Sequence, residues 1–449
     1  MDVRGSGRLR QVLVLGPRNQ DRAAIDKIKE SMEKYNFHFL HPDVSMIYGS
    51  VLPSSEFSDT LDFLGFAKKA VDYVRENGIA GVLFSYDNTA MVGAAVCQEV
   101  GLPGPCFESE FLCLHKYYSR LTEPSKLWCE CIFLQREAQK LEIESIHADC
   151  FPCFLKPATL TGSVGVSKVS SFSELKEKLT AYCIHLPSLA KAFQPLFHRY
   201  LDLEKYPLAT TGTAVVEEYV DDKGRYHCLE GWADSKGEVH HWATYDSQAV
   251  HIGNECLVGF FIPTMERADS VDAIVSHTQT VVKNHGLKSV FFNVDLWKRG
   301  DRIDVIEING RCTPSTMGIY HKLYGSSVYK VMTYLACGED EKCHEESPQK
   351  KPVPSHVSGR FRWYTNRKGT VSDILKFPLA RTIGEEEEIY DVTGEKSAGI
   401  MLCVEEDTYI PSTTQVGNFV LFGTSYAQLW ERAKGIVTQL CAAKLEGGF

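Results

Sequence analysis

The run Phe292-Asn-Val-Asp-Leu-Trp297 and the later run Val305-Ile-Glu-Ile-Asn-Gly-Arg-Cys312 are two strongly apolar segments that contain the polar side chains of Asp295, Glu307, Asn309 and Arg311. A short polar turn, Lys298-Arg-Gly-Asp-Arg302, separates them. We predict two strands, Leu287–Leu296 and Arg302–Ile308, joined as a hairpin across this turn. The interpretation of the rest of the chain depends on this hairpin.

The hairpin gathers groups that suit a metal ion. Alternate residues of a strand point to the same face, so Glu307, Asn309 and Arg311 share one side. Pairing of the two strands brings Asp295 beside Glu307. Two carboxylates and an amide oxygen are the hard ligands that Mg²⁺ prefers when phosphate oxygens complete its shell. We therefore predict a metal site at Asp295, Glu307 and Asn309, with Arg311 just beyond it to hold an anionic substrate or a developing phosphoryl charge.

Surface charges on an exposed hairpin are the simpler interpretation, because most charged strand residues face water. These polar residues, however, lie between apolar neighbours, as in Val305-Ile-Glu-Ile308. Burying a carboxylate in such surroundings without a cation or a hydrogen-bond donor is costly. This cost favours the metal site.

A second motif starts at Lys156, which ends an apolar run and precedes a loop that contains Gly162, Ser163 and Gly165. Glycines let backbone N–H groups approach phosphate oxygens, and a lysine at the end of a strand adds a positive charge. The loop is not a Walker loop, because the Gly-Lys-Ser/Thr ending is absent. Nucleotide contact and an ordinary Gly-Ser turn both explain this pattern.

A third motif is the apolar strand Val215–Val220, which contains the neighbouring acids Glu217 and Glu218. Such a segment offers backbone groups and one carboxylate to the edge of an adenine in an apolar slot. An edge strand with two exposed acids is the alternative. Both interpretations stay open at this point.

Length and composition are those of an ordinary globular protein. The chain has 449 residues, which at roughly 150 residues per domain suggests about three domains. The net charge of -10 includes no basic stripe, so nucleic acid is not expected as a partner. No run is apolar and long enough for a signal peptide or a membrane span, so we expect a cytoplasmic protein. Its fifteen cysteines, Cys150 and Cys153 included, are expected to be reduced packing residues.

The order of the expected elements predicts an α/β fold class with α+β parts. Apolar strands alternate with amphipathic helices over about the first hundred residues, which indicates a small parallel α/β domain. Strands at 214–220, 227–234 and 239–245 follow one another through short turns, which indicates an antiparallel sheet. A polar, proline-bearing linker then precedes a last region that ends in a helix, Tyr426–Cys441.

In this order, the motifs resemble those of the ATP-grasp superfamily. Its members have a small α/β domain, a lid strand that ends in lysine, a glycine loop, an acidic hinge for adenine and a final carboxylate, carboxylate, Asn, Arg set. The separation of 12 residues between Asp295 and Glu307 (307 minus 295) matches the usual hairpin of the superfamily. The resemblance spans roughly residues 10–335 and is weaker beyond them.

The resemblance implies a role for each motif. Lys116, which by itself reads as a solvated helical lysine, and Lys156 would neutralise the phosphates of ATP. The glycine loop would cover the phosphates, and the strand of the third motif would hold adenine. The implied site comprises Arg311 as catalytic residue, Lys116, Lys156, Gly162, Ser163, Gly165, Glu217, Glu218, Tyr219 and Val220 for ATP, and Asp295, Glu307 and Asn309 for Mg²⁺ or, alternatively, Mn²⁺. The acid that holds the ribose is open between Asp222 and Glu230.

Leu102-Pro-Gly-Pro105 and the loop after Lys156 are similar to those of the L-amino-acid ligase and carnosine synthase branch of carboxylate-amine ligases. The segment 186–211 matches no part of this pattern. The implied architecture has four parts: an N-terminal α/β domain at 1–112, an ATP-grasp domain at 113–337 with a lid at about 127–215, a linker at 338–354 and a C-terminal α+β domain at 355–449.

The resemblance also implies an activity, an ADP-forming ligase that joins a small acid to an amine through an acyl phosphate. Its partners would be small molecules, without nucleic acid or membrane, and a homodimer is compatible with this. One rival is a carboxylase that phosphorylates bicarbonate, but the long polyglycine lid loop is missing. A nucleotide-binding regulator without turnover is another, although it would not usually keep all four hairpin residues. Whether a carboxylate or an enol is activated stays open, as does whether Cys312, Thr313 and Ser315 line the substrate pocket or form a turn.

Overall fold

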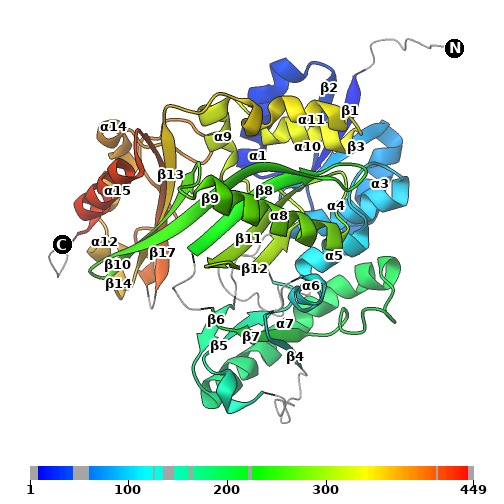
Figure 1. Cartoon of the computed structure of the whole chain (residues 1–449), viewed down its shortest axis with the longest axis horizontal. Helices are drawn as coiled ribbons and strands as arrows, with labels where there is room; N and C mark the ends of the chain where they lie inside the picture. Colours follow the sequence, from blue (N-terminus) through cyan, green and yellow to red (C-terminus); the bar gives the residue numbers. More distant parts are fainter. Residues whose placement is uncertain are drawn as a thin grey trace.

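The computed structural model describes residues 9–43, 60–124, 127–134, 146–160, 165–220, 225–410 and 413–442. These residues form a parallel three-stranded sheet, an antiparallel four-stranded sheet, a large antiparallel eight-stranded sheet and a small two-stranded sheet, with helices packed around them (Figure 1). The predicted mixed α/β fold class is confirmed.

The N-terminal unit is built around the run Val12–Leu15, whose side chains are almost completely buried. Its elements are β1 (Arg10–Leu15), α1 (Asn19–Ile28), η1 (Lys29–Met32), β2 (Tyr35–Leu40), α3 (Phe63–Asn77), β3 (Ile79–Leu83), α4 (Asp87–Val100) and α5 (Phe107–Leu114). The parallel order is β2-β1-β3, and a central parallel strand covered on both faces requires such an apolar run. Helix α4 follows β3 closely, so its first residue, Asp87, lies at the carboxyl edge of the sheet, where α/β proteins commonly bind ligands.

The four-stranded sheet and a long helix form a separate layer below the large sheet in Figure 1. Its elements are α6 (Lys116–Thr122), β4 (Cys129–Phe133), η2 (Ala148–Cys150), β5 (Cys153–Pro157), β6 (Ser167–Val169), α7 (Phe172–Tyr200) and β7 (Thr213–Glu218). The strand order is β4-β7-β5-β6. Helix α7 has 29 residues and includes the first half of the segment 186–211, to which no role was assigned from the sequence.

The large sheet carries the predicted hairpin at one edge. Its strands are β8 (Arg225–Ala233), β9 (Val239–Ile252), β10 (Glu255–Ile262), β11 (Val290–Arg299), β12 (Arg302–Asn309), β13 (Val357–Thr365), β15 (Met401–Leu402) and β17 (Thr414–Gly423). They follow the order β12-β11-β8-β9-β10-β13-β17-β15. The hairpin β11–β12 is confirmed, and it turns at Gly300, whose φ of 61° lies in the left-handed region that favours glycine.

Helices cover the large sheet and connect it to the parallel sheet. They are α8 (Ala268–His285), α9 (Met317–Tyr324), α10 (Val328–Ala336), α11 (Asp340–Glu346) and η3 (Pro348–Lys350). Helix α8 packs on β8 and β9, whereas α10 packs on both β3 and β11 and so lies between the two sheets. The segment 338–354, interpreted as a linker, contains α11 and η3, and Gln349 Nε2 donates to the carbonyl of Trp242 at 2.9 Å.

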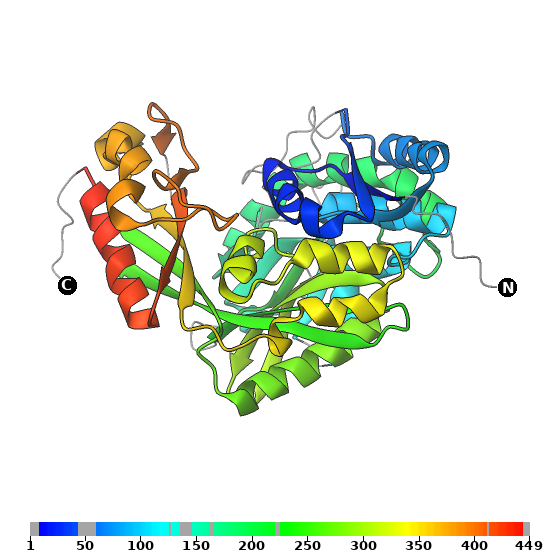
Figure 2. The ribbon, with the colours of Figure 1, turned by 90° about the horizontal axis from the view of Figure 1, so that it is seen from above.

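The C-terminal part continues the large sheet, because β13 pairs with β10 along the whole length of β10. Its further elements are β14 (Gly369–Thr370), α12 (Val371–Ile374), α13 (Phe377–Thr382), α14 (Gly384–Glu387), β16 (Tyr409–Ile410) and α15 (Tyr426–Leu440). Figure 2 shows these orange and red elements at one end of the molecule and the blue N-terminal unit at the other. Strands from the second and the fourth of the proposed parts are therefore neighbours in one sheet.

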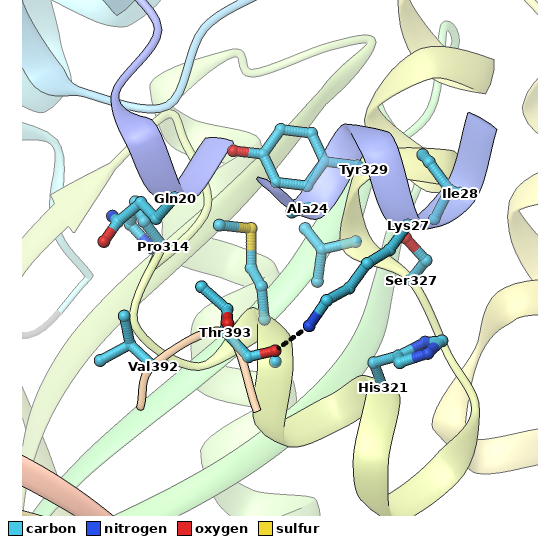
Figure 3. Close-up of a pocket in the computed structure, with 13 residues that line it drawn as sticks. Gln20, Ala24, Lys27, Ile28, Pro314, His321, Ser327, Tyr329, Val392 and Thr393 are labelled. Carbon is cyan, nitrogen blue, oxygen red and sulfur yellow. Dashed lines mark hydrogen bonds between the residues drawn. The ribbon is translucent and has the colours of Figure 1, made fainter. Parts of the chain in front are cut away.

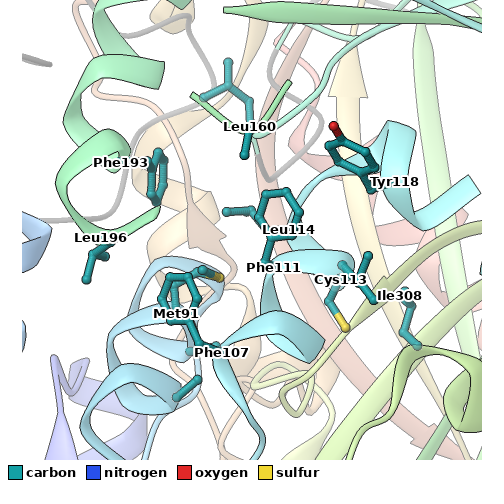
Figure 4. Close-up of a cluster of buried hydrophobic side chains, with 14 of the residues drawn as sticks. Met91, Phe107, Phe111, Cys113, Leu114, Tyr118, Leu160, Phe193, Leu196 and Ile308 are labelled. Carbon is teal, nitrogen blue, oxygen red and sulfur yellow. The ribbon is translucent and has the colours of Figure 1, made fainter. Parts of the chain in front are cut away.

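Buried apolar side chains join the layer of the four-stranded sheet and α7 to the N-terminal unit (Figure 4). Phe193 of α7 stacks on Phe63 of α3 with ring centroids 4.3 Å apart, and Phe111 of α5 meets Phe197 of α7 at 5.3 Å. Ile308 of β12 belongs to the same cluster. The strand that carries Glu307 and Asn309 is thus packed into the core that supports both units.

A pocket marks the contact between the N-terminal unit and the C-terminal part (Figure 3). Lys27 of α1 donates from Nζ to the carbonyl of Thr393 at 2.7 Å and pairs with Glu395 at 2.6 Å. Most other lining groups near Lys27 are apolar, such as Ile28 and Val392. The pocket therefore lies between two distant parts of the chain.

None of the helices within the described ranges is long and apolar enough to cross a bilayer. All fifteen cysteines have free thiols, and Cys153 is completely buried in β5.

A buried histidine at the junction of α5 and α6 makes stability sensitive to acid. The side chain of His115 is fully buried beside the rings of Phe111 and Tyr118, and burial lowers its pKa to about 3. The folded protein keeps this ring neutral, whereas the unfolded chain takes up a proton below the ordinary pKa of 6.5. This difference removes about 2 kcal/mol of stability between neutral pH and about pH 5.

His115→Gln is therefore expected to lose less stability than the wild type over the same pH step, by up to about 2 kcal/mol. Urea unfolding at neutral pH and at about pH 5 measures the difference. His251→Gln, at an exposed position of β9, is the control and should behave like the wild type. An equal acid loss in the wild type and His115→Gln would contradict the neutral state of the buried ring.

Candidate active site

Two carboxylates face each other across the hairpin. Asp295 of β11 pairs directly with Glu307 of β12, as predicted, and both side chains are half-buried. Burial and the charge of Glu307 raise the pKa of Asp295, while a hydrogen bond with Tyr226 lowers it. The negative charge of Glu307 thus disfavours the ionised form of Asp295. A divalent cation between the two would relieve that repulsion.

An amide completes the donor set. Asn309 is buried, and its Nδ2 donates to Oδ1 of Asn293 at 3.0 Å, which leaves the amide oxygen of Asn309 for another partner. No group of three or more His, Cys, Asp or Glu side chains suited to a metal occurs within the described ranges. Mg²⁺, however, usually takes only one or two carboxylates and completes its shell with water and substrate phosphates. Asp295, Glu307 and Asn309 fit this ion, and their role as its ligands remains a proposal.

Arg311 is held by an acid that sequence reasoning missed. Its Nε and Nη2 donate to the two carboxylate oxygens of Asp87 at 2.9 and 3.2 Å, and its Nη1 donates to the carbonyl of Cys312 at 3.1 Å. This two-point contact fixes the plane of the guanidinium. The position of Asp87 after the apolar strand β3, at the start of a helix, was the signal in the sequence that could have revealed it.

Lys116 lies in the same hollow rather than in solvent. The hollow is lined by Asp87, Glu110, Lys116, Glu307 and Asn309 among others. Nζ of Lys116 donates to the carbonyl of Leu160 at 2.5 Å. Burial lowers the pKa of Lys116, and the charge of Glu307 opposes that shift. The interpretation of Lys116 as a solvated helical lysine is therefore wrong.

Glu110 forms the floor of this hollow. Its carboxyl group is buried, and burial followed by the charge of Asp87 raises its pKa well above the ordinary value. A Cβ at Gly310 would lie 2.0 Å from Oε1 of Glu110, so a larger residue there would require the Glu110 carboxyl group to shift.

A buried charge cluster ties the smaller antiparallel sheet to the hairpin. Glu217 of β7 pairs with Lys156 of β5 and with Nε of Arg120, the latter at 2.9 Å. Arg120 also binds Glu123 at 2.5 Å and donates from Nη2 to the carbonyl of Ile306 at 2.7 Å. Burial raises the pKa of Glu217, but Arg120 and Lys156 outweigh it and lower the pKa to about 2.

The position of β7 corrects one interpretation of the third motif. Strand β7 lies between β4 and β5, and Glu217 is buried, so an edge strand with two exposed acids is wrong. Glu218 is half-buried and lies 3.5 Å from Arg299 and 3.4 Å from Arg302. The two glutamates thus have separate partners on opposite sides of the strand.

The remaining predicted nucleotide contacts lie around the end of β7 and the glycine loop. Tyr219 and Val220 are half-buried, and Nζ of Lys168 lies 4.2 Å from the centre of the Tyr219 ring. Gly165 has a φ of 74°, and its carbonyl accepts a hydrogen bond from Tyr182. Gly162 and Ser163 lie outside the described residues.

Glu230 supports the loop after Arg311. It is completely buried and accepts hydrogen bonds from the backbone N–H of Thr313 at 3.0 Å, from Oγ1 of Thr316 at 3.1 Å and from the hydroxyl of Tyr320. These donors occupy the carboxylate of Glu230, which was one of the two acids considered for binding the ribose. The other alternative, Asp222, lies outside the described residues.

The comparisons with known proteins agree with this geometry. Residues 150–317 match the family model described as the ATP-grasp domain, a range that includes Lys156, β7 and the whole hairpin. No curated protein matches the sequence. This match identifies residues 150–317 as an ATP-grasp domain.

Solved structures resemble the chain over nearly its whole length. L-amino acid ligase from Bacillus licheniformis is 15% identical, with 96% of this chain and 98% of that chain covered and a TM-score of 0.65. N5-carboxyaminoimidazole synthase from Aspergillus clavatus, solved with ADP, is 14% identical at the same coverages, with a TM-score of 0.58. Biotin carboxylase from Campylobacter jejuni is 15% identical, with 97% and 92% covered and a TM-score of 0.56. At these identities the likeness shows a shared fold alone.

Proposed function

We propose that this protein is an ADP-forming ligase that uses ATP to activate the carboxylate of a small molecule and then joins it to an amine. The observation that carries the proposal is one hollow lined by Lys116, Glu307 and Asn309. Asp295 faces Glu307 across the hairpin, and Arg311 is bound to Asp87, which also lines the hollow. The fold is shared with an L-amino acid ligase, among other enzymes. A cytoplasmic location, a homodimer and the use of Mn²⁺ remain predictions.

The residues of the hollow suit the polyphosphate of ATP. Lys116 and Lys156 extend from two different elements and would neutralise the phosphate oxygens as point charges. Mg²⁺ held by Asp295, Glu307 and Asn309 would supply further charge neutralisation at the phosphates. Because Lys156 already pairs with Glu217 at the end of β7, the adenine would lie against that strand and Tyr219.

Arg311 suits the acid substrate. Asp87 holds its guanidinium in one plane beside Glu307, so the remaining N–H groups are ready to bind a carboxylate and the acyl phosphate formed from it. The acid oxygen would attack the γ-phosphorus, ADP would leave, and the amine would then displace phosphate. Positioning and charge stabilisation supply most of the rate in such reactions.

The proposal is tested by incubating the protein with ATP, Mg²⁺ and pairs of small acids and amines. We expect ADP and phosphate release that requires one particular pair, and a product whose mass equals acid plus amine minus water. Bicarbonate-dependent ATP consumption without any amine would instead support a carboxylase. Tight ATP binding without consumption, for every pair tried, would support a regulator and contradict the ligase.

A further inference from the structure

Arg360 of β13 is a buried cation without an acidic partner among the described residues. Its side chain is 9% exposed, and its Nη1 donates to Oγ of Ser315 at 2.6 Å. Within the described ranges this is the one hydrogen bond of the guanidinium, and Nε is buried without a partner there. The other buried arginines near the site are paired, Arg120 with Glu217 and Arg311 with Asp87. Arg360 is the exception within the described site.

A second guanidinium makes this arrangement still more costly. Arg362, two residues further along β13, lies on the same face, half-buried, with its guanidinium 4.9 Å from the centre of the Phe260 ring. Burial and the charge of Arg362 lower the pKa of Arg360 to about 9. Two neighbouring cations at a buried position disfavour the ligand-free state. An anion placed between them would remove that cost.

The sheet places this pair on the face that carries the proposed metal site. Arg360 pairs with Phe260, Phe260 with Ser247, Ser247 with Tyr226, and Tyr226 with Trp297. Directly paired residues share a face of the sheet, and so does Asp295, which lies two residues before Trp297. The rings of Tyr226 and Phe260, 6.2 Å apart, line the space between the two sites.

The loop after Arg311 sets the distance between the two ends of this face. Ser315, which contacts Arg360, follows Arg311 by four residues, and four residues of chain span at most about 14 Å. One small molecule of several carbon atoms can therefore contact Arg311 at one end and Arg360 at the other. The loop Cys312–Thr316 contacts Arg360 through Ser315.

We propose that Arg360, with Arg362 and Ser315, binds a substrate carboxylate that is not activated and stays free in the product. This inference rests on the proposed ligase function, which places the activated group at Arg311. The flat fork of a guanidinium matches the two oxygens of a carboxylate. The carboxylate belongs either to a dicarboxylic acid or to an amino acid that serves as the amine.

Calorimetric titrations test this proposal without turnover, first with the protein alone and then with ADP and Mg²⁺ present. Glutarate is compared with butyrate, and alanine with alaninamide, so that each pair differs in the free carboxylate. We expect that either glutarate binds at least tenfold more tightly than butyrate or alanine at least tenfold more tightly than alaninamide. Arg360→Gln should abolish this difference. Arg381→Gln, at an exposed arginine of α13, is the control.

Two results of these titrations would overturn the proposal. One is that the wild type and Arg360→Gln bind every probe equally tightly, or that neither binds any probe. The other is tighter Arg360-dependent binding of inorganic phosphate than of either carboxylate probe, which would assign the two arginines to a phosphate.

Thermal unfolding separates a binding role from a structural one. If Arg360 serves a ligand, Arg360→Gln without ligand unfolds at the same or a higher temperature than the wild type, and the glutarate- or alanine-dependent rise in Tm disappears. Arg360→Lys should recover part of that rise. A lower Tm of Arg360→Gln without ligand, together with an unchanged ligand effect, would show that Arg360 only anchors the loop at Ser315.

The two proposals fail in different ways. A protein that binds glutarate or alanine through Arg360 but consumes no ATP with any pair would refute the ligase and leave the carboxylate site standing. A protein that joins acids to amines equally fast with and without Arg360 would refute the carboxylate site alone.

Discussion

Glu307→Gln is expected to lower ATP turnover by about a hundredfold to a thousandfold and to leave the fold intact. Glutamine keeps the shape of the side chain but replaces a charged metal ligand by a neutral amide. The substitution also removes the like charge that raises the pKa of Asp295. Measurements of ADP release, with titration of Mg²⁺ at fixed ATP, should show both a slower rate and weaker metal dependence.

The control for this variant is Asp301→Asn, which removes a carboxylate from the exposed turn of the same hairpin. It should turn over like the wild type. Because Glu307 is half-buried and faces another acid, the Tm of Glu307→Gln should stay equal or rise. Wild-type rates for Glu307→Gln would refute the metal assignment, and a large fall in Tm would point to a structural role.

Glu217→Ala is expected to lower the free energy of unfolding by about 3–5 kcal/mol. The carboxylate is 3% exposed and pairs with both Arg120 and Lys156. Its removal leaves two buried cations close together, with only Glu123 to balance Arg120. Urea unfolding at neutral pH measures the loss.

The neighbouring Glu218→Ala provides a matched control on the same strand. Glu218 is half-buried and lies 3.5 and 3.4 Å from its two arginines, so its removal should cost less than about 1 kcal/mol. Equal losses in the two variants would contradict the special role of the buried cluster.

Acid provides a second check on Glu217. Its pKa in the folded protein, about 2, lies below its ordinary value of 4.5, so its contribution is present above that value and is lost as the pH falls toward 2. The stability difference between the wild type and Glu217→Ala should therefore shrink as the pH falls below 4.5. A difference that stays constant with pH would contradict the lowered pKa.

The hairpin could be predicted because its information is local. Apolar residues on both sides of Asp295 and Glu307, a polar turn with Gly300 and the two-residue period of a strand specify which side chains face each other. The buried run Val12–Leu15 indicated the parallel sheet in the same way. Such patterns act over a few residues and need no knowledge of distant segments.

The partners of these residues could not be predicted, because they come from distant parts of the chain. Asp87 and Arg311 are separated by 224 residues, and Arg120 lies 186 residues from the carbonyl of Ile306 that it binds. A lysine on a helix has the same local pattern whether it faces water or, like Lys116, a closed hollow. The sequence around Arg360 does not show that its guanidinium has no acidic partner among the described residues.

By itself the sequence determined the fold class, the hairpin and the residue types that can bind a metal and phosphates, because these follow from hydrophobic periodicity and from the chemistry of each side chain. Only the tertiary structure decided that Glu217 neutralises Lys156, that Asp87 orients Arg311 and that Arg360 has no acidic partner in the part of the chain that the structure describes. The physical reason is that burial and pairing set the energy of a charge, and both depend on which distant segments pack against it.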